Sequence, residues 1–101
     1  MKTLIAALAG ALSLGAAAAH AGVIDARQVR QDWRIDQGVR SGSLTPAETR
    51  VLRVEQGRIA RTRDRALADG AMSVRERTRI TREQNQASRD IHRLKHNALG
   101  L

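Results

Sequence analysis

The chain has no cysteine, no phenylalanine and no tyrosine, and Trp33 is its single tryptophan. The lack of cysteine excludes disulfide bonds, thiolate metal ligands and thiol nucleophiles. The scarcity of aromatic side chains predicts a thin hydrophobic core and leaves no series of rings on which nucleic-acid bases could stack. Acidic residues are few as well, because 10 Asp and Glu stand against 18 Lys and Arg, for a formal net charge of +8. A small domain of this composition must be stabilised by helix packing or by association.

Charged residues are missing from Leu4 to Ala19, a segment that follows the short positive start at Lys2. Ala19 and Ala21 then place small residues at −3 and −1 of a cleavage site. These are the parts of a secretory signal peptide, and the run is too short and Ala-rich for a membrane anchor. We therefore expect a cleaved signal peptide (1–21), a single small domain (22–101), and a periplasmic or secreted mature protein that does not span a membrane.

Proline occurs once, at Pro46, and no segment alternates apolar and polar residues as a strand does. Gly42 and Gly70 suit the left-handed conformation that ends many helices. Asp25 is a candidate N-cap for the first helix. The sequence therefore predicts an all-α fold, a three-helix unit in which a helical hairpin is preceded by a shorter helix, with helices at about 25–40, 45–68 and 73–97.

One short motif occurs twice, 28 positions apart, as GSLTPAE (42–48) and GAMSVRE (70–76). In each copy a Thr or Ser stands three residues before a Glu, which is the pattern of a capping box at a helix start. The expected cap residues are Thr45, Glu48, Ser73 and Glu76. The same offset matches Glu55-Gln56 to Glu83-Gln84 and Leu52 to Ile80. The pattern indicates a tandem duplication of a turn–helix unit.

The repeated motif also resembles the second half of an EF-hand loop, which has Gly at position 6 and Glu at position 12. The first half of such a loop is missing. Its ligand positions hold Gln37, Val39 and Ser41 in one copy and Arg65, Leu67 and Asp69 in the other. Calcium needs several oxygen ligands, and the surrounding arginines oppose a dication. We therefore expect helix capping here, and no calcium site.

The segment LTPAE, followed by a basic helix that contains Gln, resembles the LTxxQ motif of small periplasmic helical proteins, among them envelope-stress chaperones and proteins of metal tolerance. The match runs from Leu44 to about Ile59, with Glu48 where that family has Gln. RIDQGVRSGSLTPAE and DGAMSVRER also resemble small uncharacterised secreted proteins of proteobacteria, over most of the mature chain. These resemblances imply a helical periplasmic protein and bring no activity with them.

Apolar residues recur at helical spacing in all three expected helices. On the third they form one seam, made of Ile80, Gln84, Ala87, Ile91, Leu94 and Ala98. On the second they share a broad face with Leu52 at its edge, namely Ala47, Val51, Val54, Ile59 and Ala66. The first helix has two apolar sides, one with Ala26, Val29 and Trp33 and the other with Ile24, Ile35 and Val39. Either Ile35 and Val39 pack under the SGSLTP turn, or a second copy of the chain covers one side and the protein is a homo-oligomer.

His92 and His96 are four residues apart and therefore lie on one face of the third helix. Two imidazoles in this arrangement can share a transition-metal ion, and an open site of two histidines favours copper or nickel. No carboxylate or cysteine stands beside them as a third ligand. The alternative is a pair of solvated side chains that interact favourably with the C-terminal helix dipole. No other cofactor is expected.

Sixteen of the basic residues are arginines, and those of the second and third helices are expected to scatter around both helices. Their charge suits a polyanion, but export and the lack of interleaved aromatics argue against nucleic acid. An anionic lipid surface or a periplasmic protein client is the expected partner. The alternative is a solvated surface with pairs such as Asp64–Arg61 and Glu83–Arg79.

No set of nucleophile, base and orienting group can be assembled from the sequence. We therefore expect a non-enzyme. The leading hypothesis is a small exported helical protein with a binding or envelope-stress role, and the alternative is a periplasmic metal-binding protein that uses His92 and His96.

Overall fold

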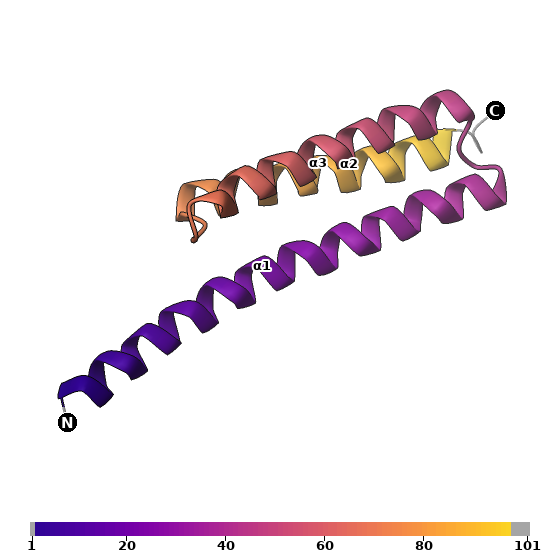
Figure 1. Ribbon diagram of the computed structural model, residues 1–101. Coiled ribbons are helices and arrows are strands. Elements are labelled where there is room, and N and C mark those ends of the chain that lie inside the picture. Colours follow the sequence, from indigo (N-terminus) through magenta and orange to yellow (C-terminus); the bar gives the residue numbers. More distant parts are fainter. Residues whose placement is uncertain (1, 98–101) are drawn as a thin grey trace.

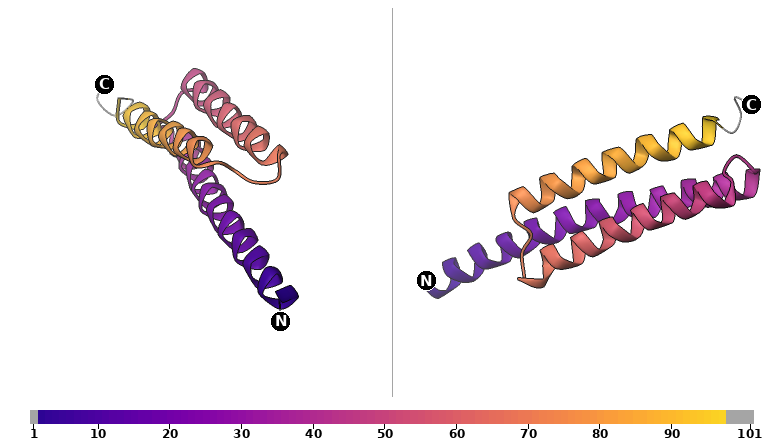
Figure 2. Two further views of the ribbon diagram at one scale, coloured as in Figure 1. Left: turned by 90° about the vertical axis from the view of Figure 1, so that its left-hand side faces the viewer. Right: turned by 90° about the horizontal axis from the view of Figure 1, so that it is seen from above.

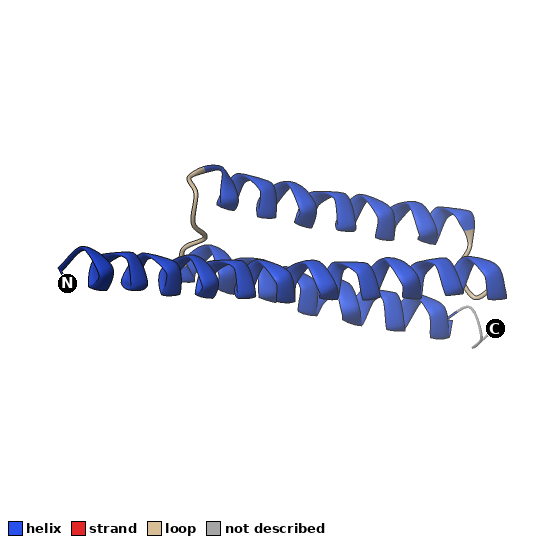
Figure 3. Ribbon diagram, turned by 60° about the horizontal axis from the view of Figure 1, so that its bottom comes forward, coloured by secondary structure: helices blue, strands red, loops and turns tan. Residues whose placement is uncertain are grey.

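The described part of the chain folds into three α-helices. A computed structural model describes the backbone of residues 2–97 and the side chains of residues 21–97. This part contains the helices α1 (Lys2–Ser41), α2 (Pro46–Ala68) and α3 (Val74–Asn97), and it contains no strand (Figure 3). α2 runs antiparallel to α1 and α3, and the long α1 extends past both (Figures 1 and 2). The prediction of an all-α, three-helix protein is confirmed.

α1 is much longer than the predicted helix at 25–40, because it continues unbroken from Lys2. Asp25 is consequently not an N-cap. The preceding segment is rich in alanine and has no proline, so nothing there stops a helix. The side chains of the expected signal peptide lie outside the described residues except for Ala21, and cleavage stays a prediction. Among the described residues, no helix has the length and apolar character that crossing a membrane requires.

The turn between α1 and α2 is packed tightly against α1. Gly42 adopts a φ of +74°, and Leu44 donates its backbone N–H to the carbonyl oxygen of Gly38 at 3.0 Å. A Cβ atom at Gly38 would lie only 2.5 Å from Cδ1 of Leu44, so this position has room for glycine alone. Ile35 does pack under the turn, against Leu44, whereas Val39 remains 48% exposed. The expectation that both residues are buried there was wrong for Val39.

The core consists of two apolar clusters along the length of the bundle. One cluster contains Ile24, Ile59, Ala66, Ile80 and Ala87. The other contains Ile35, Leu44, Leu52 and Ile91. On α1 and α2, the buried glutamines lie in sequence between the residues of one cluster and those of the other. Gln84, the buried glutamine of α3, lies opposite these glutamines. The core is therefore apolar at both ends and polar in the middle.

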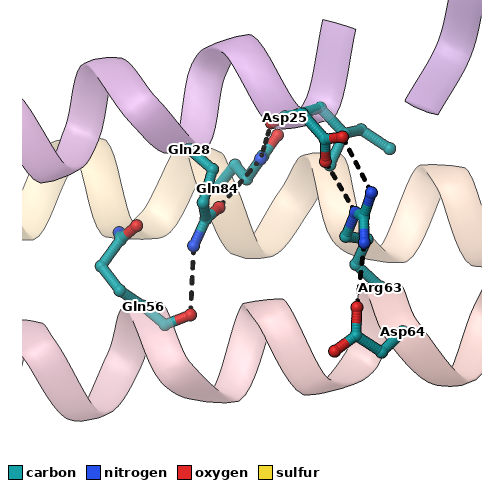
Figure 4. Close-up of polar contacts among 7 residues, drawn as sticks. Asp25, Gln28, Gln56, Arg63, Asp64 and Gln84 are labelled. Atoms are coloured by element: carbon teal, nitrogen blue, oxygen red, sulfur yellow. Dashed lines mark hydrogen bonds and ion pairs between the residues drawn. The ribbon is translucent and has the colours of Figure 1, made fainter. Parts of the chain in front are cut away.

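We call Gln28, Gln31, Gln56 and Gln84 the glutamine layer. Gln31 donates from Nε2 to the backbone oxygen of Gln84 at 2.8 Å, and its Oε1 accepts from Nε2 of Gln56 at 2.9 Å. Gln84 donates to the backbone oxygen of Ile24 at 3.0 Å, and Gln28 donates to that of Gln56 at 3.1 Å (Figure 4). These bonds connect all three helices, so they fix the register in which the helices pack.

The buried face of α3 agrees with the predicted seam, because Ile80, Gln84, Ala87 and Ile91 are all buried. Ala98 lies outside the described residues. The predicted face of α2 is confirmed for Ile59 and Ala66 and was wrong for Ala47, Val51 and Val54. Val51 and Val54 are 61% and 51% exposed, and the buried side chains are Leu52, Gln56, Ile59 and Ala66. The reason is the glutamine layer, since burying Gln56 turns α2 so that Leu52 moves from the edge to the centre of the face.

The outer side of α1 also carries apolar side chains. Val29 is 67% exposed and Trp33 60% exposed, opposite the side that buries Ile24 and Ile35. α1 therefore does have two apolar sides, as its sequence indicates. Self-association through the outer side stays a prediction.

Candidate functional site

The two copies of the repeated motif have the same local structure, each at the start of a helix. Oγ1 of Thr45 accepts the backbone N–H of Glu48 at 3.1 Å, and Oε1 of Glu48 accepts that of Thr45 at 2.9 Å. Ser73 and Glu76 make the same pair of bonds, also at 3.1 and 2.9 Å. Hydrogen bonds with Ser73 hold the pKa of Glu76 below its usual value. All four residues thus act at helix starts.

Five of the six positions that calcium would need in the first halves of the two loops are placed in helices, and the sixth, Asp69, is the C-cap of α2. Gln37, Val39 and Ser41 belong to α1, while Arg65 and Leu67 belong to α2. Among the described residues, no group of three or more His, Cys, Asp or Glu side chains could hold a metal ion. Glu48 and Glu76, the would-be bidentate ligands, are engaged by backbone N–H groups. The geometry at both turns is that of a capped helix.

His92 and His96 lie side by side on the exposed surface near the end of α3. Their ring centroids are 3.8 Å apart and their planes make an angle of 27°. Nδ1 of His96 is 2.7 Å from the backbone oxygen of His92, so it acts as the donor there and Nε2 is its free ring nitrogen. Lone pairs of imidazole nitrogens lie in the ring planes. Two stacked rings cannot direct them at one ion, and chelation would require a ring to rotate.

A group of carboxylates lies between α2 and α3. Glu55, Arg58 and Ile59 of α2 and Glu83 and Gln86 of α3 line a hollow on this side of the bundle. Glu55 and Glu83 occupy matching positions in the two copies of the sequence repeat, and both line this hollow. Oε1 of Glu55 and Oε2 of Glu83 are buried and have no hydrogen-bond partner.

Glu55 titrates unlike an ordinary glutamate. Burial raises its pKa to about 7, with further increases from the hydrogen bond and the charge of Asp90, against the opposing charges of Arg58 and Arg93. For Asp90 burial also raises the pKa, but hydrogen bonds from Glu55, Gln86 and Arg93 outweigh it and hold the pKa low. Below about pH 7 the pair therefore holds one proton, on Glu55, and one negative charge, on Asp90.

Several carboxylates are neutralised by arginines between helices. Asp25 accepts from Nε and Nη2 of Arg63 at 2.6 and 2.8 Å (Figure 4). Arg53 of α2 binds Asp36 of α1 and lies 3.6 Å from Asp32. Within α3, Arg79 binds Glu83 at 3.1 Å, as predicted.

Asp64 binds Arg63 at 2.9 Å instead of the predicted Arg61. The Arg63 guanidinium lies between Asp25 and Asp64, which both raise its pKa, so it bridges the two carboxylates. Arg61, by contrast, points to solvent on the outer face.

The arginines of α3 do not scatter around the helix, contrary to expectation. They gather on the side opposite the buried seam, where Arg75, Arg79, Arg82, Arg89 and Arg93 are all exposed. Arg77 is the exception and is half-buried. Steps of four and three residues keep such side chains on one face. At the offset of 28 residues, the positions of α2 that match these five exposed arginines are Ala47, Val51, Val54, Arg61 and Arg65. Arg58 of α2 matches Gln86 of α3.

Because α2 and α3 are antiparallel, the basic end of α2 lies beside the start of α3. Four arginines near the turn between these helices, which we call the turn-end arginine cluster, line two hollows of the surface: Arg65, Arg75, Arg79 and Arg82. The sequence carried a signal for this cluster. Aligning the two units position by position shows that basic residues occupy the outer face at the end of the first copy and the start of the second.

Comparison with known proteins places the chain in no family. No protein-family model matches it, and neither a curated protein nor a solved structure is similar to it. The function must therefore be argued from the residues themselves.

Proposed function

We propose that the chain is an exported, non-catalytic binding protein that acts in the bacterial envelope through its basic surface. The observation that carries this proposal is the one-sided arrangement of arginines on α3 and the end of α2. Many carboxylates are occupied by ion pairs with Arg53, Arg63, Arg79 and Arg93. Arg61, Arg65, Arg75 and Arg82 therefore present charge to a partner, which we expect to be an anionic surface or a protein client.

Two further features support this proposal. The signal-peptide pattern and the resemblance to LTxxQ proteins support the envelope and a stress-related role. Self-association through Val29 and Trp33 would add a second copy without covering the α2–α3 surface.

The test is an aggregation-suppression assay with a heat-denatured client protein, run beside co-sedimentation with anionic vesicles, each at low and high salt. We expect activity in at least one assay at low salt and its loss at high salt, because exposed charges are screened. Inactivity in both assays at low salt would contradict the proposal.

A second candidate function is binding of copper or nickel, favoured by the adjacency of the His92 and His96 rings. Nε2 of His96 is free, and the rings are exposed, so a rotation costs little packing. Titration of copper or nickel into the wild type and into the His92→Ala/His96→Ala variant tests it. Equal affinity of the two proteins would remove the site.

A further inference from the structure

The turn-end arginine cluster forms a pair of adjoining hollows in the surface. The first is lined by Thr62, Arg65, Ala66, Glu76 and Arg79. The second is lined by Arg75, Thr78, Arg79, Arg82 and Glu83. Arg79 belongs to both hollows, so the two are continuous across the start of α3.

The carboxylates of these hollows are already engaged. Glu76 accepts the backbone N–H of Ser73 in the capping box, and Glu83 accepts from Nε of Arg79. In contrast, Arg65, Arg75 and Arg82 are exposed and form no ion pair with any described residue. The hollows therefore present an excess of positive charge and several free guanidinium donors.

The remaining polar groups narrow the chemistry of a ligand. The hydroxyl groups of Thr62 and Thr78 donate to the backbone oxygens of Arg58 and Val74, at 3.1 and 2.8 Å, so their hydrogens are not available. All donors to a ligand must then come from guanidinium groups. These groups offer two parallel N–H bonds and match the oxygens of phosphate better than an ammonium does. No aromatic ring lines either hollow, so nothing there would stack on a base.

The spacing suits more than one phosphate. Arg75 and Arg82 are two helical turns apart, about 10 Å along the axis, with Arg79 between them. Arg65 approaches from the neighbouring helix and shares a hollow with Arg79. A single phosphate cannot reach all four side chains, whereas a group of phosphates can.

We propose that the turn-end arginine cluster is a binding site for clustered phosphate groups, presented either by a phospholipid surface or by a soluble polyphosphorylated molecule. The inference rests on the proposed function, because it names the site and the ligand chemistry of the basic surface. The inference requires that binding depends on where the arginines lie as well as on the total charge of the protein.

The test compares two variants that lose the same charge. The site variant is Arg65→Gln/Arg75→Gln/Arg82→Gln, which leaves the Arg79–Glu83 pair in place. The control variant is Arg30→Gln/Arg40→Gln/Arg50→Gln, three exposed arginines away from the hollows. Circular dichroism first establishes that both variants retain helix content and melting temperature. Binding is then measured by calorimetric titration of sodium tripolyphosphate and by co-sedimentation with vesicles of phosphatidylglycerol, with phosphatidylcholine vesicles as reference.

We expect the wild type to bind at least one of the two phosphate probes. The site variant should bind at least tenfold more weakly, and the control variant less than threefold more weakly. Binding of tripolyphosphate alone would identify a soluble ligand, binding of phosphatidylglycerol alone a lipid surface, and either supports the site. Equal losses in both variants would overturn the site but leave a diffuse basic surface and the proposed function intact. A wild type that suppresses aggregation yet binds neither probe would also overturn the site alone.

Discussion

Thr45 and Ser73 each satisfy a backbone N–H group at the start of a helix. Replacing either by alanine should lower the free energy of unfolding by about 0.5–2 kcal/mol, as for other N-caps. Glu48→Ala and Glu76→Ala should cost less, because the bond from the cap side chain survives. Thermal unfolding followed by circular dichroism measures both effects.

The same experiment separates capping from calcium binding. Millimolar calcium or a chelator should leave the melting temperatures of the wild type and all four variants unchanged. A calcium-dependent increase in the wild type that disappears in Glu48→Ala or Glu76→Ala would show that the glutamates are metal ligands.

Glu55 makes the stability depend on pH. Its pKa is raised on folding, from 4.5 to about 7, so its contribution is full below pH 4.5 and is lost as the pH rises through about 7. Asp90 has a lowered pKa, so its contribution to stability depends on pH in the opposite direction. This contribution is lost only as the pH falls into stronger acid. We therefore expect a higher melting temperature at pH 5.5 than at pH 8.

The Glu55→Gln variant isolates this effect, because an amide can donate to Asp90 at every pH. The variant should lose most of the difference between pH 5.5 and pH 8, and at pH 8 it should be at least as stable as the wild type. If variant and wild type depend on pH alike, Glu55 does not carry the proton.

Sequence patterns identified the side chains of the caps but not the behaviour of Glu55. A capping box is local, since its partners are three residues apart. The pKa of Glu55 depends on Asp90, which is on another helix, and on burial that only packing creates. The sequence matches Glu55-Gln56 to Glu83-Gln84, but this match carries no sign of a raised pKa.

At the scale of the elements, two glycines in helices differ in their surroundings. Gly38 faces Leu44, and an added Cβ would approach Cγ of that residue to 2.6 Å. We expect Gly38→Ala to be destabilising, because overpacking costs about 1–3 kcal/mol and exceeds the gain in helix propensity. Gly57 is the matched control, since the nearest atom to its Cβ would be Nη1 of Arg61 at 3.9 Å.

Gly57→Ala should therefore stabilise the protein by about 0.5–1 kcal/mol. Urea unfolding of the two variants measures both changes. Opposite signs are expected, and a stabilising Gly38→Ala would show that Leu44 can move away without loss.

The ends of α1 and α2 and the start of α2 were predictable because Gly42, Gly70 and Pro46 mark them, whereas the start of α1 was not. The rotation of α2 was not predictable. Val51 and Val54 are more apolar than Gln56, so a pattern of hydrophobicity alone turns the wrong side inward. Burial of Gln56 is accompanied by the hydrogen bond that its Nε2 donates to Oε1 of Gln31 on another helix, and a pattern of hydrophobicity does not contain this bond.

For the whole molecule, export is the central expectation. Because Ala19 and Ala21 form an Ala-x-Ala site, the mature protein should begin at Gly22. The intact mass of the protein from the envelope fraction measures this directly. Retention of Met1 would contradict it. Cleavage at this site would leave Ile24, which is buried in one of the apolar clusters, in the mature protein.

The glutamine layer has a consequence for how the protein can evolve. Three of its acceptors are main-chain oxygens, those of Ile24, Gln56 and Gln84. A main-chain oxygen is present whichever amino acid occupies the position, so no substitution can delete it. Drift is therefore constrained at the side chains, which supply all the donors and the two remaining acceptors, Oε1 of Gln31 and Oε1 of Gln28. Ile24 can change to another apolar residue without breaking the network, whereas Gln28 and Gln31 cannot be replaced one at a time without losing a link between helices.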